Sequence, residues 1–351
     1  APATAPPTGL TPTSAAAYAG GMVRGLAGAA LALSLVAPRL AAADVNDLVI
    51  SRLGTRVTDA NGALINVVGQ NHEFRALASQ LGVVLAPHLL TPADTLGFGG
   101  FQLTVDYSTT TIDSNASYWK ARAGSTDPSG TGSTAHGPDM LQTVGLFVRK
   151  GIWFPVPSFE IGAGAVHLVD SNLWTGQLYT KIALHEGYRS LPIPSLAVRG
   201  AVSRMMTQRD LDLTVASLDV TVSKHIGVGG TWRFDPYAGW NLLLIIPRSE
   251  VVDPTPHVDS LQPGNEIDSE LNFVFREQDN ILRHRILVGA KFQYYVLQLT
   301  VEAQFALAGS SVDDRTGTTE PCMPNSGTTM CDAKDSAAAQ RTLSVSAGFD
   351  F

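Results

Sequence analysis

Apolar and polar residues alternate along most of this chain. In the segment 297–307 every second residue is apolar, and Gln298, Thr300, Glu302 and Gln304 lie between them. Side chains of a strand point alternately to its two faces, whereas those of a helix return to one face about every 3.6 residues. The period of two therefore predicts an extended strand with one apolar and one polar face.

The same period recurs along the chain in segments that are long for strands. Strands of globular sheets usually have about 5 or 6 residues, whereas a tilted strand needs roughly 9 to 11 residues to cross the hydrocarbon of a bilayer. The pattern predicts strands near 74–86, 96–109, 140–151, 159–170, 173–185, 195–207, 211–223, 228–247, 281–293, 295–308 and 341–351.

These strands predict a fold. Only a closed barrel satisfies the backbone hydrogen bonds of strands inside hydrocarbon, and membrane barrels alternate apolar-out with polar-in and have even strand numbers. We predict an all-β fold, a transmembrane antiparallel up-and-down β-barrel of about twelve strands, with the twelfth between residues 48 and 70. A further paired strand at 270–276 would make fourteen. The alternation changes phase within 211–223, which predicts a β-bulge near Ala216.

The predicted connections differ in length at the two ends of the barrel. Those on the side of the last residue are short, at 152–158, 187–194, 224–227 and 294–295. Several on the opposite side are long, at 110–139, 248–280 and 309–340. Short periplasmic turns and longer extracellular loops are typical of outer-membrane barrels, so we expect the carboxyl terminus in the periplasm.

Residues 22–43 have the features of a secretory signal peptide. Arg24 supplies the positive start, the uncharged stretch 25–38 supplies the apolar centre, and Ala41 and Ala43 supply the small residues needed for cleavage. The apolar stretch is too short to cross a bilayer, which takes about 20 residues.

The signal peptide divides the rest of the chain. Residues 1–21 are expected to be an upstream extension of the reading frame or a disordered leader. We predict an N-terminal periplasmic segment at 44–73, where the first strand would lie, and an outer-membrane barrel at 74–351.

Composition narrows the class of protein. Hydrophobic residues make up 44% of the chain and charged residues 16%, against roughly 25% charged in soluble domains. The alternative of a soluble β-sandwich would have shorter strands and more charge. The net charge is −7 and the chain has no basic run, so we do not expect a surface that binds nucleic acid.

Cys322 and Cys331 lie in a Gly/Ser/Thr/Pro-rich stretch without a nearby pair of histidines, which favours a loop disulfide over a zinc site.

The chain ends in Phe349-Asp350-Phe351. This ending is similar to the aromatic signal by which the barrel-assembly machinery recognises its clients, and together with the signal peptide and the alternating strands the chain resembles bacterial outer-membrane β-barrel proteins as a class. The resemblance implies an integral protein of the cell outer membrane, with both termini in the periplasm. Outer-membrane lipid and the barrel-assembly machinery are the implied partners.

The inward faces of the predicted strands carry both signs of charge. The lumen-lining candidates are Arg75, Asp106, Glu160, Lys181, Arg199, Arg233, Asp235, Lys291, Glu302 and Asp350. A ladder of one sign would indicate an ion-selective pore, whereas mixed signs favour no ion. Internal salt bridges that fill the barrel and an open pore are equally compatible with this set. We therefore expect a porin-like channel for a small solute, or a structural and surface-interaction component.

An outer-membrane enzyme acting on lipids is the alternative function. A serine hydrolase needs a serine, a histidine and a carboxylate within hydrogen-bond reach, and the sequence offers Ser203, His185, and His167 with Asp170. No G-x-S-x-G motif accompanies them. We expect no enzyme, no cofactor and no metal site.

Overall fold

The computed structural model describes residues 44–129, 135–154, 158–186, 193–256, 268–313 and 334–351, together with 258, 262, 264, 320–321 and 330–331. The predicted leader at 1–21 and the predicted signal peptide at 22–43 lie outside the described residues.

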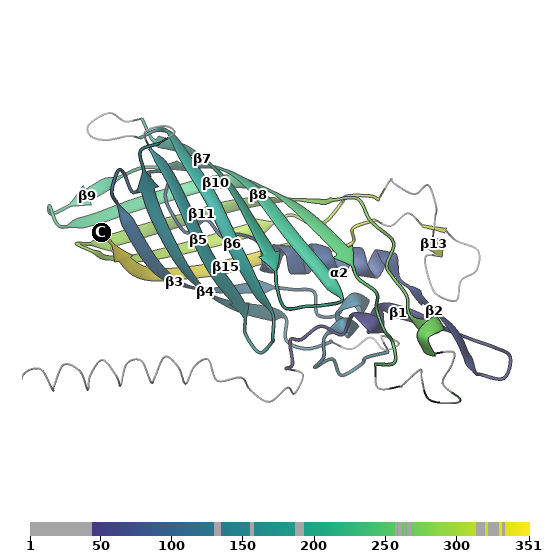
Figure 1. Ribbon diagram of the computed structural model, residues 1–351. Helices are drawn as coiled ribbons and strands as arrows, with labels where there is room; N and C mark the ends of the chain where they lie inside the picture. The colour runs from purple at the N-terminus through teal and green to yellow at the C-terminus, as the bar shows by residue number, and fades with distance from the viewer. Residues whose placement is uncertain are drawn as a thin grey trace, which may run out of the picture. The chain divides into compact units, whose positions relative to one another are not determined.

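Ten long antiparallel strands form a closed barrel (Figure 1). They are β3 (Phe101–Thr111), β4 (Met140–Ile152), β5 (Phe159–Leu168), β6 (Trp174–His185), β7 (Ser195–Met205), β8 (Leu211–Ser223), β10 (Trp232–Ser249), β11 (Ile281–Tyr294), β12 (Leu297–Ala306) and β15 (Gln340–Asp350). Each pairs with its neighbours in the chain, and β15 pairs with β3. The last pairing closes the sheet, so the barrel strands leave no free edge.

The structure corrects the predicted strand count. The segment 74–86 is not a strand, because Asn71–Val84 forms the helix α2. The segment 48–70 contributes β1 (Gly54–Thr58) and β2 (Leu64–Gly69), which pair only with each other. The described barrel therefore has ten strands, an even number as expected, and the twelve-strand prediction is not confirmed.

The remaining short elements lie in connections. The 3-10 helices are η1 (Ile50–Leu53), η2 (Ser117–Ala121) and η3 (Asp268–Leu271), and the third of these occupies part of the segment considered as a further strand. β13 (Glu320–Pro321) pairs with β14 (Met330–Cys331), and β9 (Ile226–Val228) pairs with β10. No described helix is both long and apolar enough to cross a membrane.

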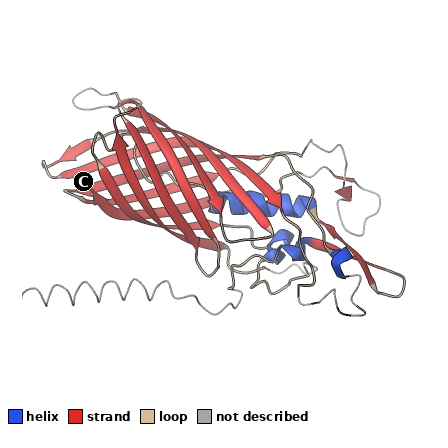
Figure 2. Cartoon of the chain, viewed as in Figure 1, coloured by secondary structure: helices blue, strands red, loops and turns tan. Residues whose placement is uncertain are grey.

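Helix α2 is buried on nearly every side. Phe74, Leu77, Leu81 and Val84 recur at helical spacing, and all the side chains of α2 except that of His72 are buried. The helix packs against β8, β10, β11 and β15 from inside the barrel. Figure 2 shows α2, in blue, at the end of the barrel that carries β1 and β2.

The packing of α2 explains the change of phase in β8. Leu211, Leu213 and Val215 face inward and belong to the same buried core as α2. Farther along the strand, the inward positions are Ser217, Asp219 and Thr221. The register of β8 with both neighbours is regular, so the predicted β-bulge near Ala216 is wrong. The inward face stays the same, and only its chemistry changes.

The outer face of the barrel is apolar over most of its height. Leu299, Val301 and Phe349 are exposed on it, as the alternation predicted. Aromatic side chains gather at the end that holds the carboxyl terminus, where Phe351 stacks on Phe349 and packs near Phe101. Near the opposite end, the outer face carries polar groups such as the Arg204–Asp212 ion pair.

The described chain begins and ends at opposite ends of the barrel. Asn46 donates its backbone N–H to the carbonyl of Asp170, in the turn between β5 and β6, at 2.8 Å. Phe351 pairs with Phe101 at the other end of the strands, with N–O distances of 2.8 and 2.9 Å. Asp44 and Phe351, the two ends of the described chain, therefore lie at opposite ends of the barrel, and the periplasmic position of both termini stays a prediction.

Candidate functional site: a filled lumen

Residues 71–96 fill the barrel, and we call them the plug. The plug begins beside the long connections, where the Asn71 side-chain oxygen accepts the backbone N–H of Arg276 at 2.8 Å. After α2 the chain is irregular, with bends along 86–94, and the Leu85 carbonyl accepts hydrogen bonds from Gln177 and Ser203 on the barrel wall. The plug then continues to the other end, where the chain turns back into β3 (Figure 1). The lumen that an open pore would need is occupied by the protein's own chain.

Cationic side chains of the wall hold the carbonyl groups of the plug. Arg285 donates to the carbonyl of Pro87 at 2.8 Å, and Arg199 donates to that of His88 at 2.7 Å. Arg149 donates to the carbonyl of Leu90 at 3.2 Å.

Lys181 holds two more carbonyl groups. Its ammonium donates to the carbonyls of Asp94 and Pro92, at 2.9 and 3.3 Å. These hydrogen bonds are charge-assisted, and such bonds are the stronger class.

Carboxylates of the wall hold the amide groups of the same segment. Glu302 accepts the N–H of Leu90 at 3.0 Å, and Glu160 accepts that of Leu96 at 3.1 Å. Glu186 accepts both the N–H and the hydroxyl of Thr95. The two signs of charge therefore match the two polarities of a peptide group, because cations meet carbonyls and anions meet amides.

The wall charges also pair with one another. The ammonium of Lys181 lies 3.2 Å from the carboxylate of Glu160, and the Arg199 guanidinium lies 2.7 Å from that of Asp219, with all four side chains buried. Tyr179 donates its hydroxyl to Glu160 at 2.5 Å. A buried charge that is both paired and hydrogen-bonded offsets much of its desolvation cost. The network fixes the plug rather than leaving a charged pore.

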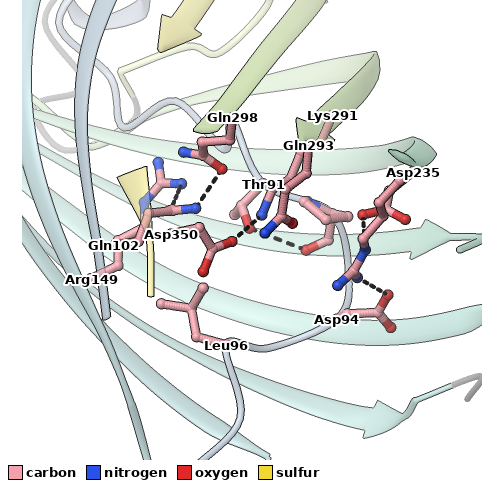
Figure 3. Close-up of polar contacts among 12 residues, drawn as sticks. Thr91, Asp94, Leu96, Gln102, Arg149, Asp235, Lys291, Gln293, Gln298 and Asp350 are labelled. Atoms are coloured by element: carbon pink, nitrogen blue, oxygen red, sulfur yellow. Dashed lines mark hydrogen bonds and ion pairs between the residues drawn. The ribbon is translucent and has the colours of Figure 1, made fainter. Parts of the chain in front are cut away.

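A polar cluster closes the end of the plug near the carboxyl terminus, as Figure 3 shows. Lys291 of β11 bonds Asp350 of β15 at 2.6 Å, past the intervening strand β12. Arg233 joins Asp235 of the wall to Asp94 of the plug, at 2.6 and 3.3 Å. The part of the plug around Asp94 is thus bonded to the barrel wall.

An amide pair completes the cluster on β3 and β12, the two strands that flank β15. Gln102 accepts from Arg149 at 2.7 Å and donates to Gln298 at 2.6 Å. Arg149 in this way joins the amide pair to the carbonyl of Leu90 in the plug.

The predicted lumen residues face the interior with one exception. The residues that line the lumen from barrel strands are Asp106, Glu160, Lys181, Arg199, Arg233, Asp235, Lys291, Glu302 and Asp350. Arg75 instead belongs to α2, where it donates to the carbonyl of Asp279 at 2.7 Å. Arg75 is buried because it anchors the helix to a loop, and not because it faces a channel.

Sequence reasoning missed several wall residues that hold the plug or its partners. The missed residues are Arg149, Asp219, Asn241, Arg283 and Arg285. The alternation carries the signal for three of them, since Arg283 and Arg285 share the face of Lys291, and Arg149 shares the face of Thr143. Their partner could not be found in the same way, because the plug was predicted as a strand.

The residues considered for a lipid enzyme do not meet. Ser203 donates its hydroxyl to the carbonyl of Leu85 at 2.8 Å. His167 stacks on Trp174, and His185 is exposed near the other end of β6.

No three metal-ligating side chains lie close enough to hold a metal ion in the described part of the chain. The predicted disulfide between Cys322 and Cys331 lies outside the described side chains.

Comparison with known proteins shows no family for this chain. No protein-family model and no curated protein sequence matches this chain. The solved structure of Ail, the attachment invasion locus protein of Yersinia pestis, covers 72% of this chain and 99% of its own, at 8% identity and a TM-score of 0.27. The outer membrane protease OmpT of Escherichia coli covers 72% and 95%, at 9% identity and a TM-score of 0.23. Likenesses this distant carry no argument about this chain. The closed antiparallel barrel, with an apolar exterior and a polar interior, has by itself the architecture of outer-membrane β-barrel proteins.

Proposed function

We propose that this protein is an integral outer-membrane barrel closed by its own plug, and that it acts as a structural or surface-interaction component of the membrane. The observation that carries the proposal is the filling of the lumen by residues 71–96. An apolar outer band with aromatic residues at one rim supports the location, since such bands face lipid and such rims lie at the interface.

The small-solute channel is the competing function. It would need the plug to leave the lumen, and departure would take from Lys181, Arg199 and Glu160 the plug carbonyl and amide groups that they now hold. It would also break the contacts of α2 with the apolar core formed by β8 and β10. Both costs favour the closed state.

Planar-bilayer recording tests the proposal. The purified protein should give no steady conductance steps, whereas a variant that lacks residues 44–96 should give them once heat-modifiable gel migration shows that its barrel is folded. If the deletion variant does not fold, solute entry into vesicles that contain the wild-type protein decides the question. Steady channel steps or rapid solute entry with the wild-type protein would refute the closed barrel and support the channel.

A phospholipid-hydrolysis assay tests the alternative enzyme. The structure offers this activity no contact among Ser203, His185 and His167. We expect no hydrolysis above the rate of a protein-free control. Hydrolysis that is lost with Ser203→Ala but kept with Ser217→Ala would establish the enzyme.

A further inference from the structure

The path of the chain through the barrel has a consequence for residues 44–70, which we call the cap segment. Asn46 contacts Val169 and Asp170, and Asp47 accepts the backbone N–H of Asn172 at 2.6 Å. These partners form the turn between β5 and β6, at the end of the barrel that carries the long connections. The cap segment therefore lies at the end opposite to Phe351.

The barrel does not need this arrangement in order to close. β3 begins and β15 ends at the same end, because the barrel has an even number of strands. A chain that entered β3 directly would stay on the side of the carboxyl terminus. Here the plug crosses the lumen once more, and the turn into β3 uses Gly97 and Gly99 with positive φ values of 71° and 86°. Glycine adopts this left-handed conformation at little cost.

We propose that the barrel carries its own cap segment through the lumen and displays it on the outer face of the membrane. The proposal rests on the outer-membrane location proposed above and on the short turns facing the periplasm. A chain delivered from the periplasmic side then has to send residues 44–70 across the membrane, and the lumen is the polar route that the structure provides.

The wall is suited to such a passage. Its cations hold carbonyl oxygens and its carboxylates hold amide hydrogens, so most of the contacts to residues 87–96 address the main chain, and fewer, such as that of Arg233 with Asp94, address side chains. Any extended stretch offers the same groups as it passes. The cap segment contains no aromatic residue, no proline and no cysteine. In extended form it therefore has a small cross-section and no disulfide. In the cap, β1 and β2 pair only with each other, which lets this hairpin form after passage.

Labelling of single cysteines tests the display. In a background with Cys322→Ser and Cys331→Ser, we choose Asn61→Cys at the exposed tip of the β1–β2 hairpin and Thr231→Cys at the exposed turn before β10. Val251→Cys, exposed in a long connection, is the control for the outer face. A membrane-impermeant maleimide should label the Asn61 and Val251 variants in intact cells, and the Thr231 variant only after the outer membrane is permeabilised.

Every other pattern overturns the proposal. Labelling of Asn61→Cys only after permeabilisation, together with Thr231→Cys, would place the cap in the periplasm. Labelling of Thr231→Cys alone in intact cells would reverse the barrel. A bilayer without conductance steps, together with a different labelling pattern, would refute the display of the cap segment and keep the closed barrel. Conductance together with the expected labelling pattern would refute the closed barrel and keep the display.

An insertion separates passage through the lumen from other routes. A small disulfide-bonded domain inserted after Asn61 should abolish surface labelling of the cap, because a folded domain is wider than an extended chain. The same insert with its cysteines changed to serine, so that it stays unfolded, should leave labelling within about twofold of the variant without an insert. Equal display of both inserts, with the disulfide shown to be formed, would refute passage through the lumen.

Discussion

The buried pair of Lys181 and Glu160 gives the sharpest test of how the plug is held. The Lys181 side chain has no exposed surface, and its ammonium meets Glu160 on the wall and the carbonyls of Pro92 and Asp94 in the plug. Lys181→Met removes the charge and leaves the Glu160 carboxylate buried without its cation. Removing one partner of a buried ion pair costs about 3–5 kcal/mol, and we expect the free energy of unfolding to fall by that amount.

The double variant separates the plug contact from the isolated charge. Glu160→Gln in addition to Lys181→Met removes the uncompensated carboxylate. The Tyr179 hydroxyl and the Leu96 N–H bond different oxygens of Glu160, so in the variant the glutamine oxygen can accept the Leu96 N–H while its NH2 donates to the Tyr179 hydroxyl oxygen. The double variant should therefore be more stable than Lys181→Met alone by about 1–3 kcal/mol, the usual cost of an unsatisfied buried polar group.

Urea unfolding in detergent micelles, followed by tryptophan fluorescence and by gel migration, measures both values. Lys150→Met is the matched control, since Lys150 on β4 donates to the carbonyl of Gly99 in an exposed position. Its effect should stay within about 0.5 kcal/mol. If Lys181→Met matched this control, or if the double variant were less stable than the single one, the plug would not depend on this pair.

Three further substitutions test the lumen at other points. Gly82→Ala should destabilise the protein by about 1–3 kcal/mol through overpacking, because the added Cβ would lie 2.7 Å from Cδ1 of Ile245 on β10. Ile245→Val in the same chain should recover part of that loss in a urea titration, and no recovery would contradict the contact. Gly97→Ala should lower the free energy of unfolding by about 1–2 kcal/mol through its left-handed backbone alone, since no atom lies within 4 Å of the added carbon. Gly200→Ala, which is equally open but has no positive φ, should lower it by less than about 0.5 kcal/mol, and equal effects would contradict the argument from backbone strain. Leu213→Ala should lower the free energy of unfolding by about 2–5 kcal/mol because Leu213 is buried against the plug, whereas Thr214→Ala on the outer face should change thermal unfolding little. The reverse ranking would mean that the inward and outward faces of β8 are exchanged.

Local alternation was sufficient for the barrel wall. Side chains in a strand point to opposite faces with a period that does not depend on the rest of the fold, so 297–307 and 341–351 identified β12 and β15, and Leu299 and Phe349 face outward as predicted. The same rule placed Lys181 and Glu160 inside. Alternation also predicted the short turns near the carboxyl terminus.

The rule failed where apolar residues meet protein instead of lipid. At Leu211, Leu213 and Val215 the apolar face looks inward, because α2 fills that part of the barrel like the core of a soluble protein. An apolar position in the sequence says that a side chain leaves water, but it does not say whether lipid or a buried helix receives it. The prediction of a bulge at Ala216 followed from assuming lipid.

What the sequence determined by itself is thus the barrel strands, their inward charges and their apolar outer face, since each depends on neighbours two residues apart. Only the tertiary structure decided that residues 71–96 enter the lumen and that the mixed charges hold a peptide backbone. The reason is physical. Arg149, Lys181, Arg199 and Glu302 meet the plug across large separations in the chain, and a charge pattern along a strand does not record what fills the space it faces.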